Sequence, residues 1–418
     1  MRIRFFVALV LTLGLVARTA PGFRLSADHR DSTIVGNAAC VQDFPSTMAP
    51  DPRATVVMCG LDNPRGLAFS ESALYVAEAG RGGLGLETPD CYMGQNSNTI
   101  NRCSAPNGAI SRLWKGIQQQ VVTGLPSDAN RLGRLAIGPH DIALVSQRRR
   151  HHRSSATAGF EACDPACAYV TIGLRQPPEF RERYPFLADF AKLVQVRPNG
   201  EWSYVADLGA YEAQNDPDQD EPDTNPYSLL VTPSGRSLVV TDAGGNSMLR
   251  VRVGKNGKPS KISTLAVFPQ HPPPDDSVPT TVAVGPDGAY YVGEFTGSAA
   301  PGAANIYRVR HAGEPPVSCV TGFRTIIDIA FDHRGNLYVL EYVGGTLWRV
   351  ALDKHATRGW PQQGGLCAAY EGGAPTVVVT GLTEPTSVAV GPDGALYISN
   401  RGSSPGTGEV IRFEPPFE

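Results

Sequence analysis

Residues 376–400 read TVVVTGLTEPTSVAVGPDGALYISN, and residues 55–78, near the other end of the chain, read TVVMCGLDNPRGLAFSESALYVAE. The two stretches correspond almost residue for residue, apart from a turn that is one residue shorter in the N-terminal copy. In each, a run of β-branched and aromatic residues precedes a short segment of turn-forming residues, and a second such run follows. The pattern predicts a strand, a tight turn and a second strand.

The same unit recurs between these two copies. Counting one copy that carries an insertion, it occurs six times, beginning near positions 63, 139, 225, 278, 326 and 384. A third apolar run follows the unit, as in NSMLRVRV, and a fourth precedes the next unit, as in WSYVADL. Such self-similarity marks repeat architectures, and the lack of helical spacing excludes a helical solenoid. We therefore predict an all-β fold, a six-bladed β-propeller of four-stranded antiparallel blades.

The first copy explains how the ring would close. Residues 55–61 precede the first predicted inner strand and have no blade of their own, whereas the last blade ends at residues 409–415 without an outermost strand. We expect the N-terminal strand to complete the last blade, because this pairs two strand edges that would otherwise be exposed. The expected organisation is a signal peptide (1–20), an N-terminal extension (21–53) and the propeller (54–418).

Composition limits the cellular context. The chain has 418 residues, 41% of them hydrophobic, and a net charge of −3, so it lacks the basic footprint of a nucleic-acid-binding protein. Arg2 and Arg4 precede an apolar run from Phe5 to Ala17 that is too short to span a bilayer with ease. This order is typical of a secretory signal peptide. We expect a secreted or periplasmic monomer with no transmembrane segment.

The cysteines agree with export. The chain contains eight, an even number that suggests disulfides in an oxidising compartment. Cys91 and Cys103 flank one polar loop and are expected to pair. Cys163 with Cys167 is a second local candidate for a disulfide. Cys40 with Cys59 is a further candidate, and this disulfide would covalently fix the closing strand.

Several of these motifs, in order, resemble one known family. NPRGLAFSESALYVAEAGRGG, VADLGAYEAQNDPDQDEPDTNPYSLLV, DAGGNSMLRV and ISNRGSSPGTGEV are similar to the ScyD/ScyE family of exported bacterial propeller proteins, over about residues 54–415. The resemblance implies export and a link to small-molecule metabolism. The insertion QRRRHHRSSATAGFEACDPAC, residues 147–167, departs from the family pattern.

A polar residue recurs at the end of the second strand in all blades but the second. In a propeller these positions share one face, so we expect a ring of polar groups at the mouth of the central channel. Two interpretations remain open: a ligand or cation site, since carboxylates bind hard cations, or structural acceptors of backbone N–H groups. The residues are Glu78, Asp242, Glu294, Glu341 and Asn400.

Other polar residues on the same face break the repeat and are therefore stronger candidates for function. We expect Arg65, Asn225 and Tyr227 to contribute to ligand binding. His140, Asp141 and Asp328 are the candidate catalytic residues. Blades two and five are opposite in a ring of six, so Asp141 and Asp328 should face each other across the channel.

Two charged segments lie outside this set. Asp216, Asp218 and Asp220 alternate as in calcium loops, although the Gly and the terminal Glu of an EF-hand are missing. They predict either a calcium site or a solvated acidic loop. The basic run RRRHHR, residues 148–153, is either solvated or contacts an anionic surface.

These patterns exclude some classes of function but do not identify one. The chain has no G-x-S-x-G, P-loop or H-E-x-x-H motif, and propellers host both enzymes and binding modules. Our first hypothesis is an exported, non-catalytic binding or assembly protein for an unidentified small molecule, with calcium as the candidate cofactor. The alternative is a hydrolase or lyase-like enzyme with His140 as acid or base and Asp141 or Asp328 orienting it.

Overall fold

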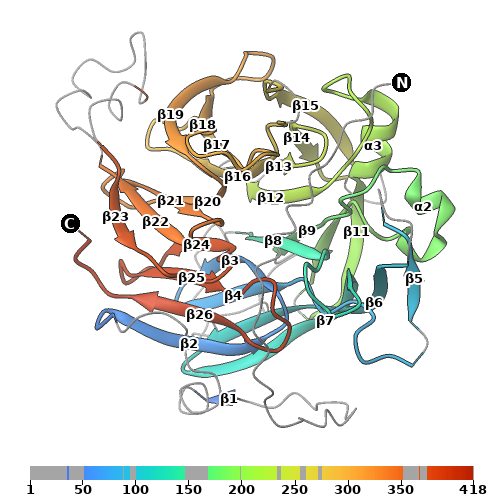
Figure 1. The fold of residues 1–418 in the computed structure, drawn as a ribbon, viewed down its shortest axis with the longest axis horizontal. Coiled ribbons are helices and arrows are strands. Elements are labelled where there is room, and N and C mark those ends of the chain that lie inside the picture. Colours follow the sequence, from blue (N-terminus) through green and yellow to red (C-terminus); the bar gives the residue numbers. More distant parts are fainter. Residues whose placement is uncertain are drawn as a thin grey trace, which may run out of the picture.

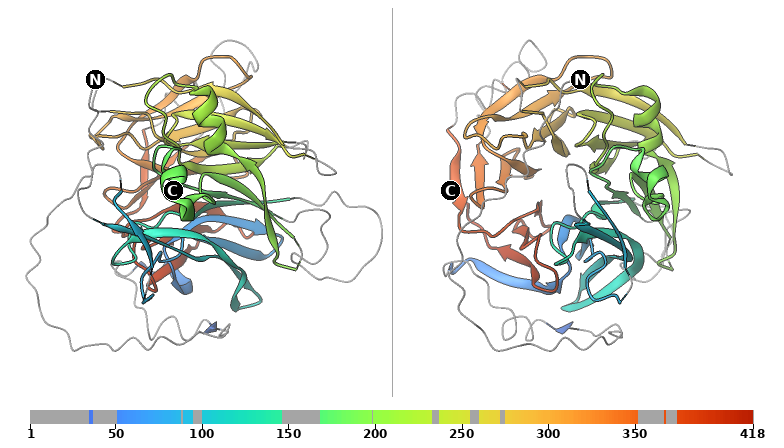
Figure 2. Two further views of the ribbon diagram at one scale, coloured as in Figure 1. Left: turned by 90° about the vertical axis from the view of Figure 1, so that its right-hand side faces the viewer. Right: turned by 45° about the vertical axis from the view of Figure 1, so that its right-hand side comes forward.

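The computed structural model is a ring of six four-stranded antiparallel units, as predicted (Figure 1). The inner strands surround the axis, and the ring is also seen obliquely in the right-hand view of Figure 2. The structure describes residues 35–36, 51–87, 89–94, 100–145, 168–197, 199–232, 237–254, 260–271, 275–351, 367 and 374–417.

The first three blades follow one another along the chain. Blade 1 contains β3 (Pro64–Ser70), β4 (Ala73–Glu78), β6 (Arg102–Trp114) and β7 (Ile117–Asn130), with β1 (Val35–Gly36) and β5 (Asp90–Tyr92) added at its edges. Blade 2 contains β8 (Pro139–Leu144), β9 (Ala168–Ile172), β10 (Lys192–Val196) and β11 (Trp202–Asp207). Blade 3 contains β12 (Pro226–Val231), β13 (Leu238–Asp242), β14 (Ser247–Arg252) and β15 (Lys261–Val267).

The last three blades repeat this arrangement. Blade 4 contains β16 (Pro279–Val284), β17 (Tyr290–Glu294), β18 (Ala304–Val309) and β19 (Val317–Phe323). Blade 5 contains β20 (Ile326–Phe331), β21 (Leu337–Glu341), β22 (Thr346–Val350) and β23 (Thr376–Val379). Blade 6 contains β24 (Ser387–Val390), β25 (Leu396–Asn400), β26 (Gly408–Phe413) and β2 (Ala54–Leu61).

The ring closes where the first long strand meets the last. Strand β2 pairs antiparallel with β26, with Ala54 opposite Phe413 and Leu61 opposite Gly408. In Figure 1 the blue β2 lies alongside the red β26. The Arg53 carbonyl also accepts a hydrogen bond from the Glu414 amide at 3.0 Å. The predicted closure of the last blade by the N-terminal strand is confirmed.

Apolar side chains of neighbouring blades pack together to form the core. Ile110 of blade 1 and Val170 of blade 2 belong to one buried cluster, and Leu340 of blade 5 and Ile398 of blade 6 belong to another. The core is therefore distributed between the blades rather than gathered at one centre, as expected when each sheet buries both of its faces.

Blade 1 extends beyond the ring. Strands β6 and β7 are 13 and 14 residues long, and β5 pairs with the start of β6. The predicted Cys91–Cys103 disulfide joins β5 to β6 and is confirmed. Tyr92 of this extension packs against Tyr184 at the end of α2 (Phe180–Arg183), with ring centroids 5.0 Å apart. The loop that connects β9 to β10 is thereby fixed against blade 1.

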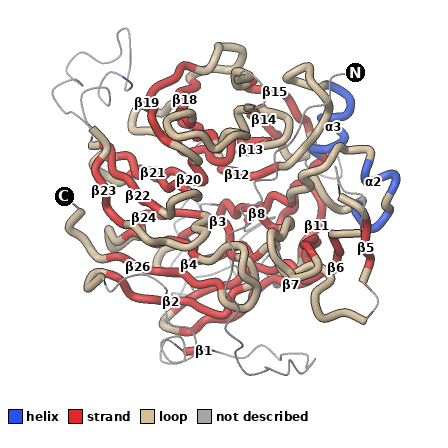
Figure 3. Tube along the Cα trace, in the orientation of Figure 1, coloured by secondary structure: helices blue, strands red, loops and turns tan. Residues whose placement is uncertain are grey.

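Helices are few and lie to one side of the ring (Figure 3). Besides α2 they include the 3-10 helix η2 (Pro185–Leu187) and α3 (Leu208–Asn215), which joins blades 2 and 3. No helix in the part of the chain that the structure describes is long and apolar enough to cross a membrane.

A second disulfide that the sequence analysis did not predict joins Cys319 in β19 to Cys367. Both disulfides are compatible with an oxidising compartment. The predicted signal peptide, Cys40, Cys163, Cys167 and the basic run 148–153 lie outside the described residues.

Deletion of residues 1–61 is expected to cause aggregation, because it removes β2 and leaves the apolar β26 edge unpaired. Deletion of residues 1–50 retains β2 and should leave a soluble monomer. Size-exclusion chromatography and thermal melting compare the two variants. Equal solubility and equal melting temperatures would contradict the role of the β2–β26 pairing.

Candidate functional site

The second strands of the blades all end on one face of the ring, which we call the loop face. It is defined by the strand ends at Glu78, Ile172, Asp242, Glu294, Glu341 and Asn400. The long extension of blade 1 and the connection from β9 to β10 are on this face as well, because both continue from these strand ends.

The recurring polar residues at these ends are buried and bonded inside their own blades. Glu78 accepts a hydrogen bond from the Asp62 amide at 2.7 Å and another from the Ser111 hydroxyl at 2.5 Å. Asp242 accepts bonds from the Asn225 amide and the Thr224 hydroxyl, both at 2.6 Å. Burial raises the pKa of Glu78 to about 7 and also raises the pKa of Asp242.

Blade 4 follows the same pattern. Glu294 accepts hydrogen bonds from the Ser277 hydroxyl at 2.8 Å and from the Asn305 amide at 2.8 Å. His271 Nε2 lies 2.9 Å from Glu294 Oε2, the oxygen that also accepts the Ser277 hydroxyl. The Glu294 side chain is fully buried.

Blades 5 and 6 complete the set. Glu341 accepts bonds from the Arg324 amide and from the Trp348 indole N–H, both at 2.7 Å. Asn400 accepts a bond from the Thr383 amide at 2.8 Å and donates to Glu409 at 2.7 Å. In every blade that carries it, this residue therefore ties down the segment that enters the first strand, as the structural interpretation describes.

The first strands contribute a second ring of polar positions around the axis, which we call the inner ring. Asp328 accepts hydrogen bonds from Thr281 of blade 4 at 2.7 Å and from Ser387 of blade 6 at 2.6 Å. The Val388 amide donates to the same carboxylate at 2.9 Å. One carboxylate thus joins three blades. The inner ring consists of Gly66, Asp141, Ser228, Thr281, Asp328 and Ser387.

Asp141 has the equivalent role between blades 2 and 3. It accepts hydrogen bonds from the Ser228 hydroxyl and the Leu229 amide, both at 2.9 Å. On its blade 1 side the inner ring has Gly66, where an added Cβ would lie 2.0 Å from Asp141 Oδ1. Burial and then the charge of Asp328 raise the pKa of Asp141 to about 7, and burial raises the pKa of Asp328.

His140 and Tyr227 directly precede the inner-ring residues Asp141 and Ser228, and their rings contact each other, with centroids 4.6 Å apart and planes tilted by 37°. His140 Nδ1 lies 3.0 Å from the Pro226 carbonyl oxygen. Because a carbonyl only accepts, Nδ1 carries the proton and Nε2 is left as an acceptor. Burial and the Arg65 charge lower the pKa of His140 to about 3, so its ring is neutral at physiological pH. Burial raises the pKa of Tyr227 to about 12.

Arg65 and Asn225 connect neighbouring blades. The buried Arg65 guanidinium donates to the carbonyl oxygens of Gly402 and Ala136, the latter at 2.7 Å. Asn225 accepts a bond from the Leu174 amide at 3.3 Å. His140, Tyr227, Arg65 and Asn225 are thus placed on the loop face, near the boundaries of blade 2.

Arg175 is a residue that the sequence analysis missed. It lies three residues after the end of β9, at the one strand end without a recurring polar residue, and its backbone amide donates to the Thr224 carbonyl at 2.9 Å. Its side chain is exposed, and its guanidinium makes no hydrogen bond or ion pair with any described residue. The surrounding loops still remove it partly from bulk water, and this desolvation, with the charge of Arg102, lowers its pKa.

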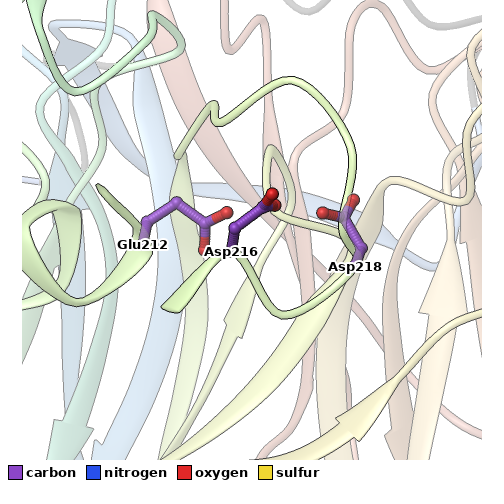
Figure 4. Close-up of side chains that lie close together, drawn as sticks. All are labelled: Glu212, Asp216 and Asp218. Carbon is purple, nitrogen blue, oxygen red and sulfur yellow. The ribbon is translucent and has the colours of Figure 1, made fainter. Parts of the chain in front are cut away.

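The acidic segment after α3 forms a separate cluster. Carboxylate oxygens of Glu212, Asp216 and Asp218 all lie within 4.8 Å of one another (Figure 4). Of the predicted calcium residues, Asp216 and Asp218 come together, whereas Asp220 accepts a bond from Gln270 at 3.2 Å. Burial and the neighbouring acids raise the pKa of Glu212 to about 9. The spacing from Glu212 to Asp216, one helical turn, was the missed signal.

A surface cleft of about 540 Å³ lies elsewhere, between β7 and β11. Its wall includes Trp202, whose indole N–H donates to the Thr123 carbonyl at 3.1 Å. Its charged residues, Arg197 and Glu201, pair with each other at 3.6 Å. The cleft lies at the turn from β10 to β11, at the opposite end of β10 from the loop face. Its lining residues form no group of acids or bases.

Known proteins share the fold. No protein-family model matches the sequence, and no curated protein is significantly similar to it. A solved structure described as an oxidoreductase (glucose dehydrogenase) from Thermus thermophilus is 17% identical, with a TM-score of 0.54, covering 87% of this chain and 99% of that chain. A protein of unknown function from Bacteroides thetaiotaomicron is 7% identical, with a TM-score of 0.50, covering 86% and 76%.

Another glucose dehydrogenase structure is 12% identical, with a TM-score of 0.49, covering 88% of this chain and 100% of that chain. At these identities the likeness shows the propeller fold alone. The resemblance to the ScyD/ScyE family rests on the sequence motifs and stays a prediction.

Asp141→Asn is expected to remove a pH dependence of stability. The folded pKa of about 7 exceeds the unfolded value of about 3.9. The contribution of this carboxyl to stability is therefore fully present below about pH 4 and is lost as the pH rises through 7. Relative to the wild type, the variant should become more stable between pH 4.5 and pH 8, measured by urea unfolding.

Ser228→Ala is the matched control, because it removes one donor to Asp141 but keeps the carboxyl. It should retain most of the wild-type pH dependence. A difference between Asp141→Asn and the wild type that does not change with pH would contradict the raised pKa.

Proposed function

We propose that this chain is an exported, ScyD/ScyE-like propeller protein that binds an anionic small molecule near the axis of the loop face, without transforming it. Arg175 carries this proposal, because it is an exposed cation on that face without a partner among the described residues. Export is supported by the apolar N-terminal run and by the disulfides.

The positive charge around Arg175 is only partly compensated. Arg102 is paired with Asp128 in a buried ion pair. The described hydrogen bonds of Arg65 go to carbonyl oxygens, which carry no full charge. A carboxylate, sulfate or phosphate group would supply the missing negative charge and accept the charge-assisted hydrogen bonds that a guanidinium offers.

The remaining groups favour a ligand with a planar, hydroxylated body. Two pairs of rings lie on this face, His140 with Tyr227 and Phe295 with Tyr342, the second with centroids 5.8 Å apart. The neutral His140 offers Nε2 as an acceptor for a ligand hydroxyl. The ligand class that fits these groups is a small aromatic or polyhydroxylated acid.

The alternative, a hydrolase or lyase-like enzyme at the same place, has one observation in its favour. The pKa of Asp141, about 7, is suited to proton transfer at neutral pH. His140, with a pKa of about 3, is a weak base and does not suit the role that the sequence suggested. The hydrogen bonds of Asp141 to blade 3 favour a structural role, so binding remains the first proposal.

Charge recognition can be tested with a matched pair of probes, 4-hydroxybenzoate and 4-hydroxybenzamide. The proposal expects the wild type to bind the carboxylate better than the amide, measured by ligand-observed NMR. Arg175→Ala should weaken carboxylate binding about 10–100-fold, as expected for the loss of a charge-assisted hydrogen bond. It should leave amide binding nearly unchanged.

Arg131→Ala is the control, because Arg131 is another exposed arginine whose side chain donates to the Ile100 carbonyl. It should bind both probes as the wild type does. An equal affinity of the wild type for the two probes, or an unaltered preference in Arg175→Ala, would refute the anion site. Turnover that Asp141→Asn abolishes while binding persists would favour the enzyme instead.

A further inference from the structure

The acidic cluster after α3 combines residues from a helix and from the loop that follows it. Glu212 is in α3, Asp216 caps the C-terminal end of the helix with a left-handed φ of 40°, and Asp218 lies in the loop toward β12. In Figure 4 the three carboxylates point toward one another, with Asp216 between the other two. Residues four apart on a helix share a face, so the helix itself brings Glu212 to Asp216.

Glu212 is the unusual member of the cluster. Its side chain is fully buried, and neither of its carboxylate oxygens has a hydrogen-bond partner among the described residues. Asp216 Oδ1 is also buried without a partner in this part of the chain. Buried polar groups are nearly always hydrogen-bonded, and an unpaired buried carboxylate is costly. The other buried acids of the loop face, such as Asp242, have several donors each.

The surroundings leave space for Glu212 but supply no compensating cation among the residues described. A Cβ added to Gly245 would lie 2.6 Å from Glu212 Oε2, so this glycine makes room for the carboxylate. Asp223 and Asp242 add further negative charge nearby. Asp218 receives hydrogen bonds from Asn246 Nδ2 at 3.0 Å and from the Asp220 amide at 3.4 Å, which orient it but bring no positive charge.

We propose that Glu212, Asp216 and Asp218 bind a single Ca²⁺ ion. All three ligands are carboxylates, without His or Cys, and this donor set selects hard cations over zinc or copper. Ca²⁺ accepts six to eight oxygen ligands in irregular arrangements, whereas Mg²⁺ demands near-octahedral geometry and dehydrates reluctantly. A site assembled from a helix end and an irregular loop therefore suits Ca²⁺ better.

Bound Ca²⁺ would also stabilise the segment that leads into β12. Thr224 accepts the Arg175 amide hydrogen bond, and Pro226 accepts the His140 hydrogen bond. The cation site and the anion site are thus joined by a few residues of backbone. The calcium proposal does not depend on the proposed function, because it rests on the carboxylate cluster and on the unpartnered oxygens of Glu212.

The test uses the full chain after treatment with EGTA, titrated with CaCl₂ or MgCl₂ by isothermal titration calorimetry and followed by thermal melting. We expect one Ca²⁺ per chain, a higher melting temperature with Ca²⁺, and a smaller effect of Mg²⁺ at the same concentration. Glu212→Gln should weaken Ca²⁺ binding by more than the ~10–100-fold that loss of an outer-shell partner causes.

Two variants separate this role from a purely structural one. Without Ca²⁺, Glu212→Gln should melt at or above the wild-type temperature, because the amide has nearly the shape of the carboxyl and cannot become charged in this buried acidic cluster. Asp220→Asn changes an acid of the same loop that lies outside the cluster, and it should keep the wild-type response to Ca²⁺. A wild type that does not respond to Ca²⁺, or a Glu212→Gln variant that responds equally, would overturn the proposal.

Discussion

The pairing of β2 with β26 is the constraint on which the ring depends. A propeller blade needs neighbours on both sides, and an open ring would expose the packing faces of blades 1 and 6 together with the edge of β26. Strand β2 prevents this by joining residues near the N-terminal end of the propeller to its last blade. The Thr386 hydroxyl reinforces the same junction, since it donates to the Pro64 carbonyl of blade 1 at 2.7 Å.

The inner ring adds links between consecutive blades. Asp328 accepts hydrogen bonds from blades 4 and 6, and Asp141 from blade 3. These side chains replace backbone hydrogen bonds, which do not link neighbouring blades in the way that they link strands of one sheet. The carboxylates are therefore both repeat-breaking and structural, so a departure from the repeat is not by itself a sign of function.

The fold could be predicted from the sequence because its determinants are local. The strand–turn–strand unit, the Gly-Pro-Asp-Gly turns and the Cys91–Cys103 pair each lie within a short stretch. In the turn at residues 285–288, for example, Gly288 has a φ of +76° and its amide bonds to Gly285. The Cys319–Cys367 pair spans 48 residues, and no local sequence pattern predicts it. Arg175 was missed for a related reason. Whether its guanidinium has a hydrogen-bond partner depends on residues that are close in space but not in sequence.

The hydrogen bonds of the polar residues on the loop face distinguish structural residues from candidate binding residues better than their positions in the repeat do. Glu78, Glu294 and Glu341 look like a ligand site in the sequence, yet each is matched by donors of its own blade. The Arg175 guanidinium and the Glu212 carboxyl lack such matches in the described structure. They flank the same backbone segment, because Thr224 accepts the Arg175 amide and also donates to Asp242, which lies near Glu212. The boundary between blades 2 and 3 thus brings an arginine and a glutamate that lack side-chain partners in the described structure close to one backbone segment.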